Sequence, residues 1–410
     1  MPAGTRTMGP REAVAALVSP EGRRDPYPLY EVIRAHGGLV AVKPGLMVAV
    51  GYAECDEALR ETRLRVQDGE SYDQIYPAWR AHSSLRAYTD SMLYRNPPDH
   101  TRMRRLVSHG FAPRRVEALR GPIERVTDRL LDRMAELGAD GPVDFIAEFA
   151  SRLPIAVISE LLGVPERDQA WFRDVAARIT IALEGITNVD RLAVADTAMD
   201  ELAAYFDDLV ARRRAAPADD VASALVQAHD TEGERLSRDE LIGNMMLMLT
   251  AGFETTSFLL GHALLIALRT PAHAARLRGE PGFATGYVEE TLRFEPPVQA
   301  TSRWAGSDVP LAGQLVPAGT KLVIMLAAGN RDPRRFAHPD RFDPDRPPFV
   351  PLSLGAGGHF CLGAPLSRME ARIALPRLLR RFPDMAVAGE PVRRDTWIGR
   401  GLDLFPVAVG

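Results

Sequence analysis

Apolar residues recur at three- and four-residue steps through the middle of the chain, and this spacing predicts amphipathic helices. The predicted helices cover residues 113–137, 148–162, 166–183 and 190–214. A longer one runs from Ser237 to Arg269, because Ser237 and Glu240 form a capping-box pattern at its start and Pro271 follows its end. About 31 helical residues extend over roughly 46 Å. This helix is apolar nearly all round over residues 241–253, so it must cross the protein interior.

Strand patterns are short and lie near both ends of the chain. Residues 39–50 predict a hairpin, and residues 301–304, 309–316 and 320–326 predict strands separated by Gly and Pro. One more helix is predicted at about 363–382, followed by a strand-like C-terminus. Residues 67–98 predict a long loop with room for one short helix, and residues 1–25 are expected to be loosely ordered. The fold class predicted is mainly α with small β-sheets (α+β), as a single domain over residues 1–410.

Composition narrows the class of protein further. Hydrophobic residues make up 46 % and charged residues 25 % of the 410 residues, as in a globular protein with a sizeable core. The formal charge of −4 argues against a nucleic-acid binder, and without a run of about 18 apolar residues we expect no membrane span. The start lacks a secretory signal, and two cysteines make no disulfide framework, so a reducing cytoplasm is the expected setting.

The second cysteine, Cys361, lies in the glycine-rich stretch Leu354-Gly355-Ala356-Gly357-Gly358-His359-Phe360-Cys361-Leu362-Gly363. Four glycines in ten residues let the backbone lie close to a flat group. The predicted helix start after Cys361, with Pro365 in its first turn, would stabilise a thiolate through unpaired N–H groups and the helix dipole. For an isolated cysteine the alternative is a small buried apolar residue.

This loop resembles the haem-binding signature of the cytochrome P450 family, Phe-Gly-x-Gly-x-His/Arg-x-Cys-x-Gly, at every position but the first, where Leu354 replaces Phe. The resemblance implies that Cys361 is the axial thiolate ligand of a haem b iron and that His359 and Gly363 border the cofactor. It also implies the cytochrome P450 fold, a single triangular-prism-like helical domain with haem between the long central helix and the helix after Cys361.

Within the long helix, Ala251-Gly252-Phe253-Glu254-Thr255-Thr256 interrupts the apolar pattern. A glycine, two threonines and a buried carboxylate each disfavour a helix core, so a function is expected, although small residues also permit close helix packing. The stretch resembles the family's oxygen-activation motif. The resemblance implies that Glu254 and Thr255 form the acid–alcohol pair that guides protons during O₂ activation, with Ala251 beside the cofactor.

Cations that would hold the haem propionates are implied at matching positions, namely His100 and Arg104 after Pro97-Pro98, Arg303 and His359. Glu290 and Arg293 match the family's Glu-x-x-Arg pair. The resemblance implies that the pair is structural and bonds to the Pro-rich segment around Arg341, Phe342 and Arg346. The alternative is an ordinary pair on a helix surface. Further arginines, 102, 105, 114, 115, 368 and 372, could form a docking patch or a solvated surface. The substrate pocket is expected to be lined by Met92, Leu93, Leu247, Val298 and Ile398, for each of which core packing is the alternative.

The function implied by the resemblance is an O₂-activating monooxygenase that hydroxylates or epoxidises a small organic substrate, in the style of actinobacterial enzymes of natural-product (antibiotic) biosynthesis. Its electrons would come from NAD(P)H through a reductase and a ferredoxin or flavodoxin. No membrane or nucleic-acid partner is expected, and the chain is expected to be a monomer. The alternatives are a haem-thiolate oxidase performing phenol coupling or peroxide-driven oxidation, and a non-catalytic haem-binding recruitment protein.

Overall fold

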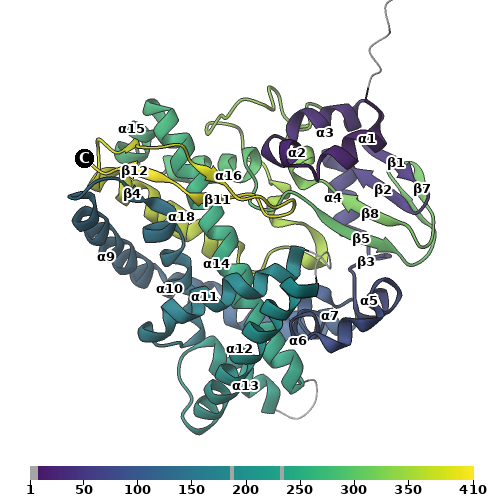
Figure 1. Cartoon of the computed structure of the whole chain (residues 1–410), viewed down its shortest axis with the longest axis horizontal. Coiled ribbons are helices and arrows are strands. Elements are labelled where there is room, and N and C mark those ends of the chain that lie inside the picture. Colours follow the sequence, from purple (N-terminus) through teal and green to yellow (C-terminus); the bar gives the residue numbers. More distant parts are fainter. Residues whose placement is uncertain (1–7, 185–188, 231–234) are drawn as a thin grey trace, which may run out of the picture. The chain divides into compact units, whose positions relative to one another are not determined.

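The computed structural model describes residues 8–184, 189–230 and 235–410, which gather into two compact units (Figure 1). Unit 1 comprises the described residues up to Arg65, Glu289–Cys361 and Arg393–Arg400. Unit 2 comprises the described residues of Val66–Val288, Leu362–Val392 and Gly401–Gly410. A single domain over residues 1–410 stays a prediction, and each unit is considered by itself.

Unit 1 is built on a five-stranded sheet with strand order β1-β2-β8-β5-β3. Its elements are α1 (Pro10–Ala16), α2 (Pro20–Arg24), α3 (Tyr27–Arg34), β1 (Leu39–Lys43), β2 (Leu46–Ala49), α4 (Tyr52–Arg60), β3 (Leu64–Arg65), β5 (Thr301–Ala305), β6 (Val309–Leu311), β7 (Gln314–Val316), β8 (Lys321–Ile324) and α17 (Leu326–Gly329). The predicted hairpin of β1 and β2 is confirmed, and β2 then pairs in parallel with β8, Met47 opposite Leu322.

Side chains on the two faces of this sheet enter two different apolar clusters. Met47 and Leu322 join one cluster, and their neighbours Val48 and Val323 join the other. This alternation follows from the two-residue repeat of a strand. Because both faces are buried, the register of β2 against β8 is fixed, and with it the position of β5 and its side chains.

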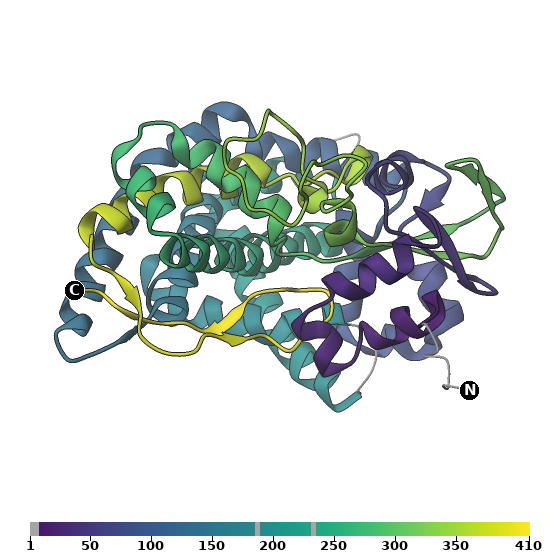
Figure 2. The same ribbon diagram turned by 90° about the horizontal axis from the view of Figure 1, so that it is seen from above.

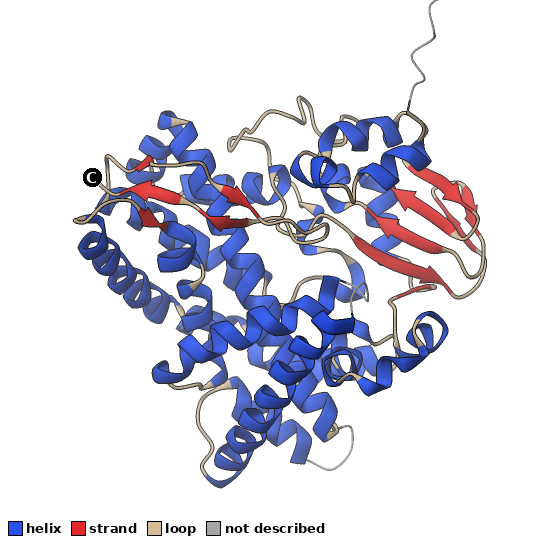
Figure 3. Cartoon of the chain, viewed as in Figure 1, coloured by secondary structure: helices blue, strands red, loops and turns tan. Residues whose placement is uncertain are grey.

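Unit 2 is mainly helical, as Figure 3 shows. Its elements are α5 (Gly69–Ile75), α6 (Ser83–Asp90), α7 (Asp99–Ser108), α8 (Pro113–Ala118), α9 (Arg120–Gly138), β4 (Val143–Asp144), α10 (Arg152–Leu162), α11 (Gln169–Thr180), α12 (Val189–Ala215), α13 (Val221–Asp230), α14 (Arg238–Arg269), α15 (Pro271–Gly279), α18 (Ala364–Arg381), β9 (Ala386–Val387), β11 (Leu402–Leu404) and β12 (Pro406–Ala408). Helix α16 (Phe283–Phe294) and strand β10 (Val392–Arg393) have residues in both units.

Helix α14 is the 32-residue element around which the helices of unit 2 pack, and Figure 2 shows it along its length. The expected capping box is present, with Ser237 accepting a hydrogen bond from the Glu240 N–H at 3.1 Å and Glu240 accepting one from Ser237 N–H at 2.8 Å. Helix α14 is also the one described helix long and apolar enough to cross a membrane, but 67 % of its most apolar window is buried inside the protein. It is therefore a core helix, as predicted, and the mainly α class with small sheets is confirmed.

Two expectations from the sequence are corrected. Residues 10–16 and 20–24 are helical, and Ala13 and Leu17 are buried in unit 1, so the loosely ordered segment does not extend over residues 8–24; residues 1–7 lie outside the described residues. Residues 67–98 form helices α5 and α6 with 3₁₀ turns at 77–81 and 92–94, not a long loop. Both stretches consist of helices of five to eight residues, too short for a three- and four-residue repeat to stand out.

Candidate functional site

The loop that carries Cys361 is held in a specific backbone conformation. Gly355 and Gly357 have positive φ angles of 70° and 65°, and the Cys361 N–H donates to the Leu354 carbonyl at 2.8 Å. A Cβ atom on Gly357 would lie 2.7 Å from the backbone oxygen of Leu59, so this position also requires glycine for space. Helix α18 begins at Ala364, with Pro365 in its first turn. The sequence-predicted arrangement of loop and helix start is present.

The two cysteines lie in opposite environments, and neither forms a disulfide. Cys361 is exposed, whereas Cys55 on α4 is fully buried, and its thiol donates to the Ala49 carbonyl at 3.4 Å. Burial raises the pKa of the Cys55 thiol, which keeps it protonated and inert. Only Cys361 is therefore placed to act as a thiolate ligand.

Helix α14 has one polar and accessible interruption. Ala251 is exposed and Thr255 is half-buried, in a helix that is buried over residues 241–250 and 256–265. The Thr255 hydroxyl donates to the Ala251 carbonyl one turn earlier at 2.9 Å, and Glu254 beside it is half-buried. A Cβ atom on Gly252 would lie 3.4 Å from Ile158 of α10, at ordinary van der Waals distance, so α10 packs closely against this side of the helix. The helix thus presents a small, hydroxylated surface at mid-length.

Arg303 on β5 is a buried cation without a carboxylate partner among the described residues. It is 6 % exposed, and its guanidinium donates to the Ser302 carbonyl at 2.8 Å and to the Thr301 hydroxyl at 3.5 Å. Burial lowers the pKa of Arg303 to about 10. A buried charge is stable only when paired, so Arg303 is suited to an anionic ligand.

The other predicted cations are distributed over both units. His100 and Arg104 lie one helical turn apart on α7 of unit 2, His100 buried and Arg104 half-buried. His359 is half-buried in the Cys361 loop of unit 1, the unit that also holds Arg303. Each unit therefore contains cations of the predicted set, considered by itself.

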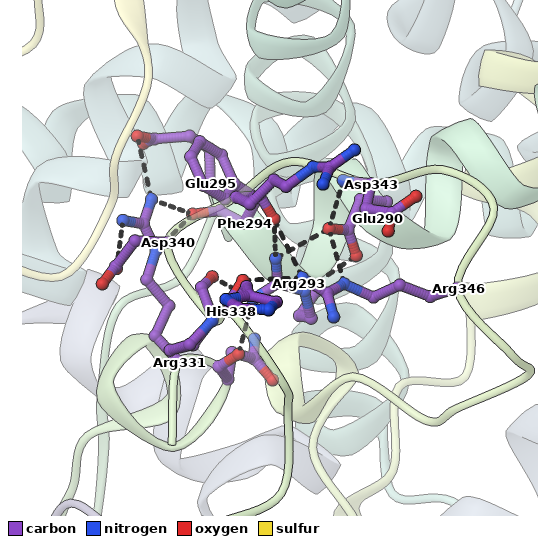
Figure 4. A network of polar contacts seen from close by, with 12 residues as sticks. Glu290, Arg293, Phe294, Glu295, Arg331, His338, Asp340, Asp343 and Arg346 are labelled. Atoms are coloured by element: carbon purple, nitrogen blue, oxygen red, sulfur yellow. Dashed lines mark hydrogen bonds and ion pairs between the residues drawn. The ribbon is translucent and has the colours of Figure 1, made fainter. Parts of the chain in front are cut away.

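Glu290 and Arg293 form a fully buried ion pair, drawn in Figure 4. The Arg293 guanidinium donates to both Glu290 carboxylate oxygens at 2.7 Å. It also donates to three backbone carbonyls of the Pro-rich segment, those of Asn330 at 3.0 Å, Pro339 at 2.8 Å and Arg341 at 3.0 Å. Glu290 in turn accepts from the Asp343 N–H at 2.8 Å and from Arg346 at 3.0 Å. The pair is a structural crosslink, not a surface pair.

The predicted substrate walls fall into two groups. Val298 and Ile398 are half-buried neighbours in unit 1, where Val298 bridges to Gly399 and the Gln299 N–H donates to the Ile398 carbonyl at 2.8 Å. In unit 2, Leu247 is 6 % exposed, Met92 is half-buried and Leu93 is 38 % exposed. Asn244 was missed from the sequence; it is buried on α14 and accepts the Met92 N–H at 3.1 Å. A polar residue in the apolar run 241–250 was the available signal.

Two arginines of the predicted docking patch are already engaged. Arg102 pairs with Glu240 at 2.5 Å and with Asp99 at 3.4 Å. Arg115 pairs with Asp219 at 3.2 Å. Arg114 and Arg105 are exposed on the same stretch of chain, whereas Arg102 is half-buried.

Comparison with known proteins identifies the fold. The family model described as Cytochrome P450 matches residues 190–282 and 283–386. The chain is 39 % identical to the cytochrome P450 monooxygenase PikC of Streptomyces venezuelae, over 93 % of this chain and 91 % of the relative. It is 37 % identical to the vitamin D(3) 25-hydroxylase of Pseudonocardia autotrophica, over 94 % of each.

A solved structure of the myxobacterial cytochrome P450 CYP267B1 in complex with myristic acid superposes with a TM-score of 0.86 at 38 % identity, covering 96 % of this chain and 98 % of that one. The two-unit structure, with a buried helix α14 and a glycine-bounded Cys361 loop, is therefore the cytochrome P450 fold, and this chain belongs to the cytochrome P450 family of haem-thiolate monooxygenases.

Proposed function

We propose that this protein is a haem b-dependent monooxygenase that hydroxylates or epoxidises a small, largely apolar organic molecule in natural-product biosynthesis. The observation that carries the proposal is the environment of Cys361, an exposed thiol at the end of a loop that requires glycine and just before helix α18. Membership in the cytochrome P450 family establishes the reaction class, that of a monooxygenase.

Three features fit a haem group, two of them in unit 1 and the third in unit 2. Cys361 offers an accessible sulfur, Arg303 is a buried cation suited to a propionate, and the exposed Ala251 leaves room beside α14 for a flat ring. No cluster of three or more His, Cys, Asp or Glu side chains lies within residues 8–184, 189–230 and 235–410 to chelate a metal by itself. Cys361 would hold the haem iron through its thiolate, His100, Arg104, Arg303 and His359 would hold the propionates, and Gly363 would contribute to the binding loop. The bound haem supplies the oxidising chemistry.

Proton delivery is assigned to the Glu254 and Thr255 pair. Glu254 is half-buried, so it can exchange protons with water while its side chain lies on the α14 surface. The Thr255 hydroxyl, which donates to the Ala251 carbonyl in this structure, has acceptor capacity left and can also rotate to donate elsewhere. Together they would pass protons from solvent to the site where O₂ is reduced.

A relative and the composition of the chain support the proposed setting. The cytochrome P450 enzyme CxnD, which acts in C–S bond formation in chuangxinmycin biosynthesis, superposes with a TM-score of 0.82 at 31 % identity, and this likeness supports a role in a biosynthetic pathway. Electrons would come from NAD(P)H through a reductase and a ferredoxin or flavodoxin. We assign the protein to the cytoplasm as a monomer, with Met92, Leu93, Leu247, Val298 and Ile398 lining the substrate pocket.

The test is the absorbance of the purified protein, reduced under carbon monoxide. The strongly red-shifted Soret band of a thiolate-ligated haem is expected for the wild type and for Cys55→Ser, the control with the other cysteine changed. Cys361→Ser should lose the band while keeping its helical circular dichroism. A wild type without the band would contradict the haem-thiolate assignment, and so would a Cys361→Ser variant that retains it.

The alternatives give different results in the same preparation. A phenol-coupling or peroxide-driven oxidase would form product without incorporating an atom of ¹⁸O₂. A recruitment protein would show the band but no NADPH-dependent turnover with any redox partner. Incorporation of one ¹⁸O atom into product is the expected result.

A further inference from the structure

Four aromatic side chains of unit 2 lie in a row, ring against ring. Tyr88 is on α6, Tyr94 in the 3₁₀ turn at 92–94, Tyr72 on α5 and Trp79 in the 3₁₀ turn at 77–81. The ring centroids are 6.0 Å apart from Tyr88 to Tyr94, 6.3 Å from Tyr94 to Tyr72 and 5.7 Å from Tyr72 to Trp79. Separations of this size are those of aromatic rings in contact, so the aromatic row is continuous.

The inner end of the aromatic row is Tyr88, which lies against α14. The backbones of α6 and α14 approach closely, since a Cβ atom on Gly243 would lie 2.7 Å from the Ala87 carbonyl oxygen. Burial raises the pKa of the Tyr88 phenol, an effect that the Thr250 hydroxyl opposes and the Glu254 carboxylate increases. Both of these α14 residues lie within one turn of the exposed residue beside which we place the haem. The row therefore begins next to the proposed site.

The outer end of the aromatic row is Trp79, whose indole is bonded to a surface carboxylate. The Trp79 N–H donates to Asp73 at 2.9 Å, and the Asp73 side chain is 42 % exposed. The Arg80 guanidinium lies over the Trp79 ring, 4.6 Å from its centroid, and donates to the same carboxylate at 2.9 Å. The carboxylate thus offsets the cation beside the ring, and it is placed to accept the indole proton and to exchange it with water.

The residue types of the row serve more than packing. Tyrosine and tryptophan are the aromatic side chains that give up an electron readily, whereas phenylalanine would fill the same space without doing so. Electron tunnelling weakens steeply with distance, so several short steps between such rings are faster than one long step. Monooxygenase chemistry leaves an oxidising equivalent at the haem whenever no substrate takes it, and this equivalent damages the protein unless an electron reaches it from elsewhere.

We propose that the aromatic row is an electron relay that carries unused oxidising equivalents from the haem to the protein surface. This goes beyond the monooxygenase activity and rests on the proposed function, which supplies the oxidant. Tyr88 gives one electron to the oxidised haem, and each tyrosyl radical takes an electron from the next ring outward. Each phenol releases its proton on oxidation and regains one on reduction.

The relay ends at the surface with Trp79. Trp79 supplies the last electron, and its N–H proton passes to Asp73 and on to water. A thiol in solution then returns one hydrogen atom to the indole nitrogen, and two thiyl radicals join as a disulfide. In sum, one electron reaches the haem for each thiol oxidised, and one proton is released at Asp73.

The first test locates oxidised tryptophan by peptide mass spectrometry after hydrogen peroxide is added to the substrate-free holoenzyme without thiol. Trp79 should carry more oxidation than Trp171, which contacts Tyr205 in a separate aromatic cluster. Trp79 is only 6 % exposed and Trp171 is half-buried, so an oxidant arriving from solvent would give the opposite order.

The second test interrupts the aromatic row. Tyr94→Phe keeps a ring at the middle of the row but should lose most of the oxidation at Trp79. Tyr76→Phe is the matched control, because its hydroxyl bonds to His82 at 3.0 Å outside the row, and oxidation at Trp79 should be unchanged. In Trp79→Phe, electron paramagnetic resonance of freeze-quenched samples should show a phenoxyl radical where the wild type shows an indolyl radical.

Oxidation at Trp79 that is no greater than at Trp171, or that persists in Tyr94→Phe, would overturn the relay. All measurements are made on protein that shows the carbon monoxide band, so these outcomes would leave the proposed function intact. A wild type without the band would contradict the proposed function and the relay together, because the relay takes its oxidant from the haem.

Discussion

Replacing Arg293 with methionine tests whether the buried crosslink of unit 1 contributes as much as its geometry indicates. The change removes two charge-assisted bonds to Glu290 and three bonds to backbone carbonyls, all in a site with 0 % exposure of both side chains. Breaking a buried pair by deleting one partner costs about 3–5 kcal/mol. Glu290 keeps Arg346 and the Asp343 N–H as partners, which places the expected loss near the lower limit, at about 3 kcal/mol.

Urea unfolding followed by circular dichroism measures the loss as the change in midpoint multiplied by the slope of the transition. Arg214→Met is the matched control, because Arg214 also forms a two-pronged pair, with Asp230 at 2.7 and 2.8 Å, but the side chains are 49 % and 40 % exposed. The control should lose less than about 1 kcal/mol. An Arg293→Met variant that loses no more than this control would refute the reasoning.

Three further predictions concern the site and the acid stability of unit 1. Thr255→Ala should raise the peroxide released per NADPH consumed and lower product, whereas Thr255→Ser should stay coupled; an unchanged ratio in the alanine variant would remove Thr255 from proton delivery. Arg303→Leu should speed haem transfer to apomyoglobin about tenfold, which corresponds to the loss of one charged hydrogen bond. The transfer rate of Arg303→Lys should lie between those of Arg303→Leu and the wild type. Equal rates for Arg303→Leu and the wild type would exclude a contact between Arg303 and a propionate. Burial of Asp332 favours its protonated form, but hydrogen bonds from Arg334 and the Tyr52 N–H outweigh this effect and lower the pKa of Asp332. The ionised carboxylate therefore stabilises the fold at pH values above the ordinary carboxyl pKa, and this stabilisation is lost as the pH falls below about 4. Asp332→Asn should therefore be less stable than wild type at pH 7, with the gap in urea midpoint closing on acidification; a gap that stays constant down to pH 3 would contradict this assignment.

Local signals in the sequence predicted the elements whose determinants lie within a few residues. The capping box at Ser237 predicted the start of α14. The glycines around Cys361 predicted a loop, and in the structure Gly355 and Gly357 adopt the positive φ angles that favour glycine. The β1–β2 hairpin was likewise predicted because its strands are adjacent in the chain. In each case the residues that give the signal lie within one segment of the chain.

Features that depend on distant segments were not predictable in the same way. Spacing and resemblance indicated Glu290 and Arg293 as a pair, but the bonds of Arg293 to backbone carbonyls could not be predicted. Those carbonyls lie 37 to 48 residues further along the chain. The helical order of residues 67–98 was missed because it depends on distant packing: α6 approaches α14 at Gly243, and the turn after α6 is bonded to Asn244 through the Met92 N–H.

The parallel pairing of β2 with β8 has a consequence for synthesis of the chain. Ala49 of β2 pairs with Ile324 of β8, so roughly 270 residues must leave the ribosome before the edge of the N-terminal hairpin is covered. At about 5–20 residues per second, that edge stays open for roughly 14–54 s. An open strand edge is a template for pairing with other nascent chains. Yield in a heterologous host should therefore depend on chaperone supply during translation, even though the finished sheet buries both of its faces.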